Sequence, residues 1–490
     1  MTNQASTGLR VSETVSEAAP KMVADLNASS DRRVCLSNAC VISMDPKVGD
    51  FVTADVLIEG DTIVEVGPNL GGGLDEAVVV IDATDTIVIP GLIDTHRHMW
   101  QGQLRRMVPN VDVAGYLGLR NAFAVKYRPH DQYAGTLTNA YGALNTGVTT
   151  LLDLSHNTRS SAHADAGVDA LEESGLRAVF AYAPPEAGEW DQQWPDDLKR
   201  IQSERFSGSD GMVSLRMAQR CFSDVDNLTA ERVGIARRLG IGMTVDPVGW
   251  DESTEKILDL AKAGLLGPDL DFVHCSDLSD EAWKAMGEAG VKVSLSPFVD
   301  ELLGFDTHAE RLPTVQRALD VGISPGLSVD IETTVPGEVF TQMRSLLAVQ
   351  RMRAALGNPT VGRPQLTARD VLAMATIHGA ETIGLDNICG SLTPGKKADI
   401  VMIDQSGPNS YPLNNAYGAV VMGADTSSVR FVMVSGRIKK WGATLVDVDV
   451  AAVRSTVEDS RAFLLEQVGY EPDLFIDYPT LDTGLPQYRP

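Results

Sequence analysis

The chain has 490 residues, of which 43% are hydrophobic and 22% charged, as is ordinary for a globular protein. Its 41 basic and 66 acidic side chains give a formal net charge of −25, which argues against nucleic acid and membrane headgroups as partners. The five scattered cysteines contain no CxxC pair, which argues against a disulfide scaffold or a thiolate zinc cluster. With no signal-peptide pattern at the start and no apolar run long enough to span a bilayer, we expect a cytoplasmic protein.

The first 88 residues predict a loose arm followed by a small β-unit. Residues 1–31 are polar and rich in small side chains, so we expect a flexible N-terminal arm there. Residues 32–88 contain short runs of Val and Ile separated by turn segments such as EGD and GPNLGGG. They predict antiparallel strands that lead to the apolar run Thr86–Ile89.

Residues 89–384 alternate between apolar strand candidates and helical stretches. The eight strand candidates are Leu92–Thr95, Thr149–Leu154, Ala178–Tyr182, Val213–Ala218, Gly242–Val245, Leu270–His274, Lys292–Leu295 and Ser324–Val329. This rhythm is typical of parallel sheets, and it fits a closed barrel or an open doubly wound sheet. Because no glycine-rich phosphate loop opens a helix here, we predict an α/β fold with a (β/α)8 TIM barrel.

Strand-like segments return after the predicted barrel. Residues 385–446 contain candidates at Asp399–Ile403, Gly418–Met422 and Val429–Val434. We expect them to pair with residues 32–88 and form one small β-sandwich domain from both chain ends. Residues 447–490 predict a C-terminal helix at Ala451–Gln467 and an irregular tail.

Two of the eight histidines stand one residue apart, in the segment PGLIDTHRHMW. Side chains at positions i and i+2 of a strand point to the same side, so His96 and His98 face one point. At the carboxyl end of a barrel strand that point is the catalytic mouth. Two imidazoles there suit a divalent metal ion such as zinc. An HxH pair alone is a weak signal, and its position after an apolar strand strengthens it.

Several segments resemble the amidohydrolase superfamily, in the expected order. IVIPGLIDTHRH resembles its first barrel strand, NTGVTTLLDLS the second and GSLTPGKKADIVMID the return to the β-domain. The segment ending in His274 resembles the sixth strand, and GISPGLSVD, ending in Asp330, resembles the eighth. The likeness is greatest to the single-metal branch of cytosine and guanine deaminases and triazine hydrolases. It implies a metal-dependent hydrolase, and family habit implies a homo-oligomer.

The resemblance also assigns roles to individual residues. The presumed fourth strand, Val213–Ala218, has no lysine that could bridge two metals as a carbamate, which favours one ion. Gln219 follows this strand and resembles a substrate contact of cytosine deaminases, although it is equally compatible with an ordinary polar strand end. His156 follows the second strand directly and either contacts substrate or metal or caps the next helix. Trp100 and Gln103 follow the histidine pair and are further candidates for the substrate pocket.

The fifth strand departs from the family pattern. That branch has a His-x-x-Glu there, whereas the segment GIGMTVDPVGW contains neither residue. Asp246 could replace the histidine as a ligand, which zinc, iron, manganese or cobalt would accept, or His274 could become the third ligand. A third reading is a metal-free barrel that acts as a binding or assembly protein. We favour retained metal, because His96, His98, His274 and Asp330 would otherwise be a costly cluster of unpaired polar groups.

The chemistry that follows is hydrolysis of a small molecule by metal-activated water. Asp330 would accept the proton of the water and pass it to the leaving group, and His274 would hold the hydroxide or polarise the substrate. The absence of the fifth-strand glutamate favours hydrolysis of an amide, carbamate, urea or aryl C–N bond over deamination of a nitrogen heterocycle. Deamination remains the alternative.

Overall fold

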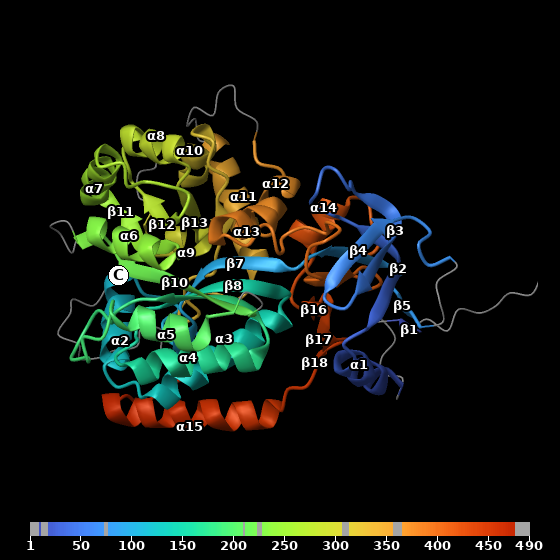
Figure 1. Cartoon of the computed structure of the whole chain (residues 1–490), viewed down its shortest axis with the longest axis horizontal. Coiled ribbons are helices and arrows are strands. Elements are labelled where there is room, and N and C mark those ends of the chain that lie inside the picture. The colour runs from blue at the N-terminus through green and yellow to red at the C-terminus, as the bar shows by residue number, and fades with distance from the viewer. Residues whose placement is uncertain are drawn as a thin grey trace, which may run out of the picture.

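The computed structural model describes residues 9–10, 18–72, 77–208, 211–222, 228–305, 313–355 and 365–475. Two sheets organise these residues, a ten-stranded sheet and an eight-stranded sheet. Figure 1 shows the barrel with its helices on one side and the ten-stranded sheet, coloured blue and orange-red, on the other. The predicted fold class, a (β/α)8 barrel with a small β-domain from both chain ends, is confirmed.

The barrel strands are all parallel and follow one another in chain order. They are β7 (Leu92–Arg97), β8 (Val148–Ser155), β9 (Arg177–Tyr182), β10 (Val213–Arg220), β11 (Met243–Gly249), β12 (Leu270–Ser276), β13 (Lys292–Leu295) and β14 (Gly326–Leu327). Every residue of β8 is buried, as expected for a parallel strand covered on both faces. The eight predicted strand positions therefore correspond to the eight strands of the barrel.

The ring closes between the first and last strands. A parallel bridge pairs Arg97 with Asp330, and the amide of Asp330 donates to the carbonyl of His96 at 3.0 Å. The amide of His98 in turn donates to the carbonyl of Asp330, also at 3.0 Å. The backbone that closes the barrel therefore also fixes the histidine pair beside Asp330.

Helices and short turns connect the strands and cover the barrel. They are η1 (Met99–Leu104), α2 (Val113–Ala124), α3 (Pro129–Asn145), α4 (Ser161–Ser174), α5 (Asp197–Arg205), α6 (Leu228–Leu239), α7 (Trp250–Lys262), α8 (Asp280–Ala289), α9 (Pro297–Leu302), α10 (Thr314–Asp320), α11 (Val339–Ala355), α12 (Ala368–Met374) and α13 (Ile377–Ile383). Among the described residues, no helix is both long and apolar enough to cross a membrane.

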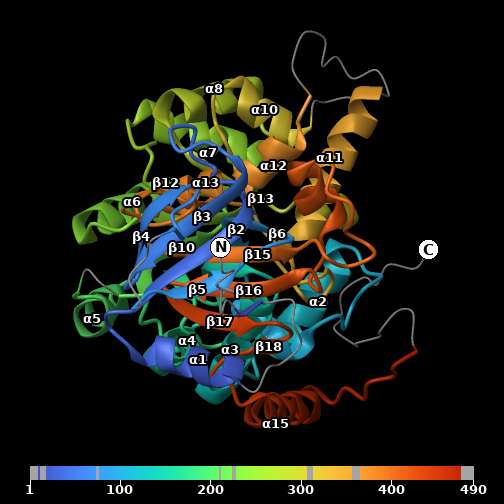
Figure 2. The same cartoon turned by 90° about the vertical axis from the view of Figure 1, so that its right-hand side faces the viewer.

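The second sheet combines strands from before and after the barrel. They are β1 (Leu9–Arg10), β2 (Arg33–Val41), β3 (Phe51–Glu59), β4 (Thr62–Gly67), β5 (Val79–Asp82), β6 (Thr86–Pro90), β15 (Ile400–Asp404), β16 (Val429–Val434), β17 (Arg437–Trp441) and β18 (Thr444–Leu445). Strands β6 and β15 join the two chain ends in antiparallel register, with Val88 opposite Met402. Figure 2 shows the blue and orange-red strands side by side in this sheet. Not every pair is antiparallel, because β2 runs parallel to β5 and to β6.

Two local predictions need correction. The arm expected over residues 1–31 includes helix α1 (Ala18–Ala28), because Val23 and Leu26 are buried in the core of the β-domain. The strand expected at Gly418–Met422 is instead a helical segment, α14 (Ala416–Gly418) followed by the π-helical turn η2 (Ala419–Gly423). The side chain of Asn415 accepts from the amide of Gly418 and starts this segment as an N-cap.

The C-terminal helix α15 (Val450–Val468) packs along α3, below the barrel in Figure 1. Its Leu464 and Leu465 share a core cluster with Trp100 and Phe123. Ser460 donates to the carboxylate of Asp131 on α3 at 2.8 Å. The last part of the predicted tail lies outside the described residues.

Candidate metal centre and active site

The centre of the site is a cluster of three imidazoles and two carboxylates at the carboxyl ends of four barrel strands. His96 lies on β7 and His98 follows it, Asp246 lies on β11 and His274 on β12, and Asp330 follows β14. All five residues are almost completely buried. His274 and Asp330 have positive φ angles of 69° and 67°, a conformation that non-glycine residues rarely adopt and that clusters at functional sites.

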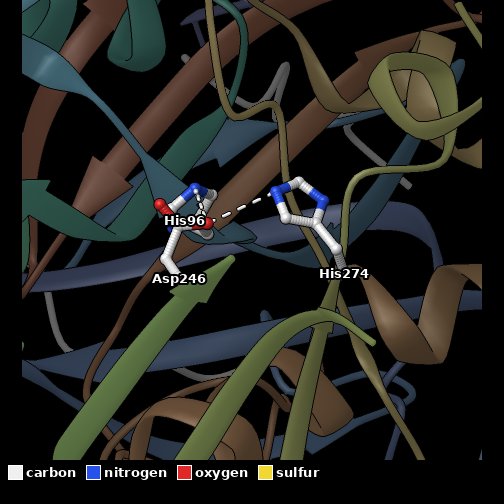
Figure 3. Close-up of side chains that lie close together, drawn as sticks. All are labelled: His96, Asp246 and His274. Atoms are coloured by element: carbon white, nitrogen blue, oxygen red, sulfur yellow. Dashed lines mark ion pairs between the residues drawn. The ribbon is translucent and has the colours of Figure 1, made fainter. Parts of the chain in front are cut away.

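The side chains of these five residues converge on one point. Asp330 Oδ1 lies 3.3 Å from Nε2 of both His96 and His98. Asp246 Oδ1 lies 3.3 Å from Nε2 of His274 and 3.7 Å from Nε2 of His96, as Figure 3 shows. The second oxygen of Asp246 lies 3.6 Å from Nε2 of His98. Sequence analysis predicted this set as metal ligands, and the fold brings all five together.

The separations within the cluster are close to those that one metal ion requires. Two ligand atoms that each lie about 2.1 Å from an ion are themselves separated by roughly 3.0–3.5 Å. The nitrogen–oxygen distances in the cluster are 3.3–3.7 Å. Two groups of three residues have ligand atoms within 4.8 Å of one another and could hold an ion, one of His96, Asp246 and His274 and one of His96, His98 and Asp330. The two groups share His96 and therefore lie next to each other.

The hydrogen bonds of the imidazoles also fit a cation. The Nδ1 of His98 lies 3.1 Å from the carbonyl oxygen of Leu154, so it carries the proton and leaves the Nε2 lone pair facing the carboxylates. Burial lowers the pKa of His98 to about 4, which keeps the ring neutral. The Nδ1 of His96 is buried without a hydrogen-bond partner in the described structure, and its Nε2 faces the carboxylates of Asp330 and Asp246. The Nε2 lone pair of His98 and the carboxylate oxygens that face it repel each other. A cation bound between them would remove that repulsion.

His274 is held differently. Its Nδ1 lies 2.6 Å from Oδ1 of Asp300, which follows β13 on helix α9. Burial opposes a charge on His274, but the carboxylates of Asp300 and Asp246 raise its pKa well above the ordinary value. A ring held in this way can donate from Nε2 toward an oxygen at the centre of the site. Sequence reasoning missed Asp300, which lies far from His274 in the chain and follows a strand without a recognised motif.

A cavity of about 230 Å³ opens beside the cluster. His98, Asp246, His274 and Asp330 form its polar end. Much of the remaining wall is apolar and includes Val113, Leu117, Phe222, Leu303, Phe305 and Ile331. Its dimensions suit a small organic molecule with one end at the imidazoles and carboxylates.

None of the four predicted substrate contacts is among the residues that line this cavity, and three of them are engaged elsewhere in the fold. The amide of Gln219 donates to the carbonyl of Cys221 and to Thr229, and its oxygen accepts from Arg232. Gln103 donates to the carbonyl of Asp131 and to Ser460 on α15. The indole of Trp100, a residue of η1, packs in a buried cluster with Phe123 and Leu464. We therefore leave these three residues out of the proposed substrate site.

His156, the fourth predicted contact, packs against His98 and does not itself line the cavity. Its ring stacks on His98 with a centroid separation of 4.1 Å, and its Nδ1 accepts from the indole of Trp100 at 3.0 Å. The Nε2 of His156 therefore carries the proton and lies 3.6 Å from Oε1 of Glu186, which lines the cavity. Contact between His156 and a substrate remains a prediction.

Three charged residues of the cavity wall were missed at the sequence level. Arg120 lies on α2, Glu186 follows β9 and Arg220 is the last residue of β10. Arg220 had a usable signal, because it ends a barrel strand directly after Gln219. Neighbouring residues of a strand point to opposite sides, so only one of the two can face the cavity. The structure places Arg220 there.

Comparisons with known proteins agree with this architecture. The model described as "Amidohydrolase family" matches residues 87–439. A 5'-deoxyadenosine deaminase from Methanosarcina acetivorans is 27% identical over 426 residues, covering 83% of this chain and 92% of that protein. A 5-methylthioadenosine/S-adenosylhomocysteine deaminase from Symbiobacterium thermophilum is 28% identical, covering 83% of this chain and 93% of that protein.

Solved structures share the fold. An adenosine deaminase from Xanthomonas campestris with bound zinc superposes with a TM-score of 0.78 at 19% identity, covering 88% of this chain and 98% of that chain. The atrazine chlorohydrolase from Arthrobacter aurescens, in complex with zinc, has a TM-score of 0.75 at 21% identity, covering 87% of this chain and 100% of that chain.

Proposed function

The chain belongs to the amidohydrolase family and is a hydrolase of carbon–nitrogen bonds other than peptide bonds, and we propose that it works with one divalent metal ion. His96, His98, Asp246 and Asp330 would hold the ion, with Asp246 in place of the fifth-strand histidine. The observation that carries this proposal is the convergence of these side chains at distances of 3.3–3.7 Å. In this assignment His274 is a hydrogen-bond donor to the reacting oxygen, because Asp300 supports its protonated form.

A divalent ion in this site would supply water acidified enough to attack at neutral pH. Asp330 lies against both His96 and His98, so its carboxylate can take the proton of the attacking water and return it to the leaving nitrogen. The surrounding imidazoles, His96 first, hold the pKa of Asp330 below its ordinary value despite burial, which keeps its carboxylate ionised, the form that can accept a proton. His274 donates from Nε2 and stabilises negative charge on the substrate oxygen.

Zinc is the metal that we propose, since zinc is bound in the two similar structures described above. Iron, manganese and cobalt are the alternatives, because two carboxylates with imidazoles suit these ions as well. We also propose a cytoplasmic homo-oligomer that acts on a small molecule. None of the five cysteines forms a disulfide bond in the described structure, which supports a reducing compartment. Mass measurement in solution would test the oligomeric state.

A second candidate is deamination of a nitrogen heterocycle. The names of the relatives favour it, because both are deaminases of adenine nucleosides. The absence of the fifth-strand glutamate from the sequence favours hydrolysis of an amide, carbamate, urea or aryl C–N bond instead.

A substrate panel separates the two candidates. One half contains adenosine, 5'-deoxyadenosine, cytosine and an aminotriazine, and the other contains aryl amides, carbamates and ureas. Ammonia released from an aminated ring identifies a deaminase. The other class is identified by an amine and a carboxylic acid from an amide, by an amine, an alcohol and carbon dioxide from a carbamate, or by two amines and carbon dioxide from a urea. The Asp330→Asn variant is the control, and activity that it retains in full would remove this site from the reaction.

A further inference from the structure

We propose that Arg220 is a binding site for a carboxylate or similar anionic group of the substrate, so that the enzyme acts on small organic acids. This inference rests on the proposed function, because it takes the cavity beside the metal centre as the substrate site. It concerns the wall of that cavity formed by Arg120, Glu186 and Arg220.

The three side chains form a chain of ion pairs in which positive charge is in excess. Glu186 contacts both guanidinium groups, Arg120 through Nη1 at 3.2 Å and through a shorter contact from Nη2, and Arg220 through Nη1. Arg120 is further fixed by Asn121, whose side-chain oxygen accepts from its Nε and Nη2 at 3.2 and 3.0 Å. One carboxylate therefore balances one of two arginines, and the trio keeps a charge of about +1.

Arg220 carries the surplus charge in an accessible form. Its side chain is 34% exposed, whereas that of Arg120 is 6% exposed. Among the described residues, Glu186 is the one hydrogen-bond partner of the Arg220 guanidinium, and it accepts from Nη1. Nε and Nη2 of Arg220 thus remain available as a fork for the two oxygens of a carboxylate.

The surroundings define the rest of the ligand. Arg220 on β10 pairs in register with Asp246 on β11, so the proposed anion site lies one strand from the metal centre. Strands in a sheet are about 4.8 Å apart, which limits the substrate to a short distance between its anionic group and the bond that is cleaved. Phe222, Phe305 and Leu117 line the same cavity and suit an apolar or aromatic body. The fitting class is a small aromatic or heteroaromatic acid with a hydrolysable C–N bond.

The test is binding of matched acids and amides to the metal-loaded protein by calorimetry. Benzoate and nicotinate are the anionic probes, and benzamide and nicotinamide are their neutral counterparts of the same shape. We expect the acids to bind at least about tenfold more tightly than the amides, and Arg220→Gln to abolish that difference. Arg220→Lys keeps the charge without the fork and should retain part of it.

Arg237→Gln is the matched control, because the Arg237 side chain is 36% exposed and pairs with Asp269 outside the cavity. Equal affinity of acids and amides for the parent protein would overturn the proposal. So would a preference for the acids that survives in Arg220→Gln, which is the result expected if the carboxylate bound the metal instead. Metal content and turnover of the substrate panel are measured separately, so failure of the anion site is distinguishable from failure of the hydrolase assignment.

Discussion

Two clusters of buried charge lie on opposite sides of the same short stretches of chain. His96 and His98 point into the barrel mouth toward Asp330, whereas Arg97, between them, points away toward Asp94 and Glu332. The cluster of Arg97 is balanced by the protein itself, since its guanidinium donates to Glu332 at 3.3 Å and to the carbonyl of Gly337 at 2.9 Å, and Glu332 also accepts from Arg105 at 2.6 Å.

The metal-centre cluster is arranged differently. The Nε2 atoms of both His96 and His98 face the carboxylates of Asp246 and Asp330, at 3.3–3.7 Å. Charged residues that stabilise the fold and charged residues that form the site thus stand next to each other in one motif. Charges that satisfy one another support the fold, whereas charges that need an added cation mark the site.

The largest effect should come from His98→Ala. Removal of this imidazole should abolish bound metal and lower turnover by at least about 10⁴-fold, while the melting temperature of the metal-free protein changes little. Elemental analysis and thermal unfolding check the two parts. A variant that keeps a full equivalent of metal would show that His98 belongs with the structural charges.

Asp330→Asn should lower kcat by about 10²–10⁴-fold, because the amide cannot accept a proton. KM should change far less than kcat, since the shape of the side chain is retained. Steady-state kinetics on an active substrate of the panel gives both values. Near-normal kcat would exclude Asp330 from proton transfer.

Glu332→Gln should lower the stability of the fold without affecting metal binding, unlike the two substitutions above. It leaves the buried guanidinium of Arg97 and the half-buried one of Arg105 short of a counter-charge and should cost roughly 3 kcal/mol in free energy of unfolding. Metal content should remain at the level of the parent. Denaturant unfolding with elemental analysis checks this, and loss of metal without loss of stability would break the division between the two clusters.

Lys440 on β17 provides a smaller and pH-dependent test of buried charge. Its ammonium is buried between the sheet and the barrel, where it donates to the carbonyl of Asn145 at 2.6 Å, and burial lowers its pKa to about 8. The unfolded chain therefore binds more protons between pH 8 and 10.4, and the folded state should gain stability as pH rises through that range.

The gain is at most ~3 kcal/mol, from the size of the pKa change. Lys440→Met should remove it, which unfolding experiments at pH 7.5 and 10 would show. If parent and variant respond equally to pH, Lys440 is not the source of the dependence.

The barrel and the metal-centre residues could be predicted from the sequence because both follow from patterns of neighbouring residues in the chain. Alternation of apolar strands with helices fixes the order of β7 to β14, and a ligand at a strand end must face the barrel mouth. Asp246 could be predicted for the same reason, as the ionisable residue at the end of the fifth strand.

The cavity wall could not be predicted in this way. Side chains alternate between the two faces of β10, so Gln219 and Arg220 point in opposite directions. A shift of one residue in the strand's alternation would put Gln219 in the cavity in place of Arg220, and the sequence does not define this alternation. Asp300, Glu186 and Arg120 meet the site from loops and helices, whose course is set by tertiary packing. Trp100 and Gln103 follow the histidine pair closely, but η1 turns them toward α3 and α15.

Elemental analysis of the purified protein beside Asp246→Ala and His274→Ala tests the central claim most directly. We predict about one equivalent of divalent metal in the parent and in His274→Ala, and loss of metal in Asp246→Ala. That result would establish Asp246 as the replacement for the fifth-strand histidine. Metal retained in Asp246→Ala, or no metal in the parent after growth with zinc, iron, manganese or cobalt, would contradict the proposed metal centre.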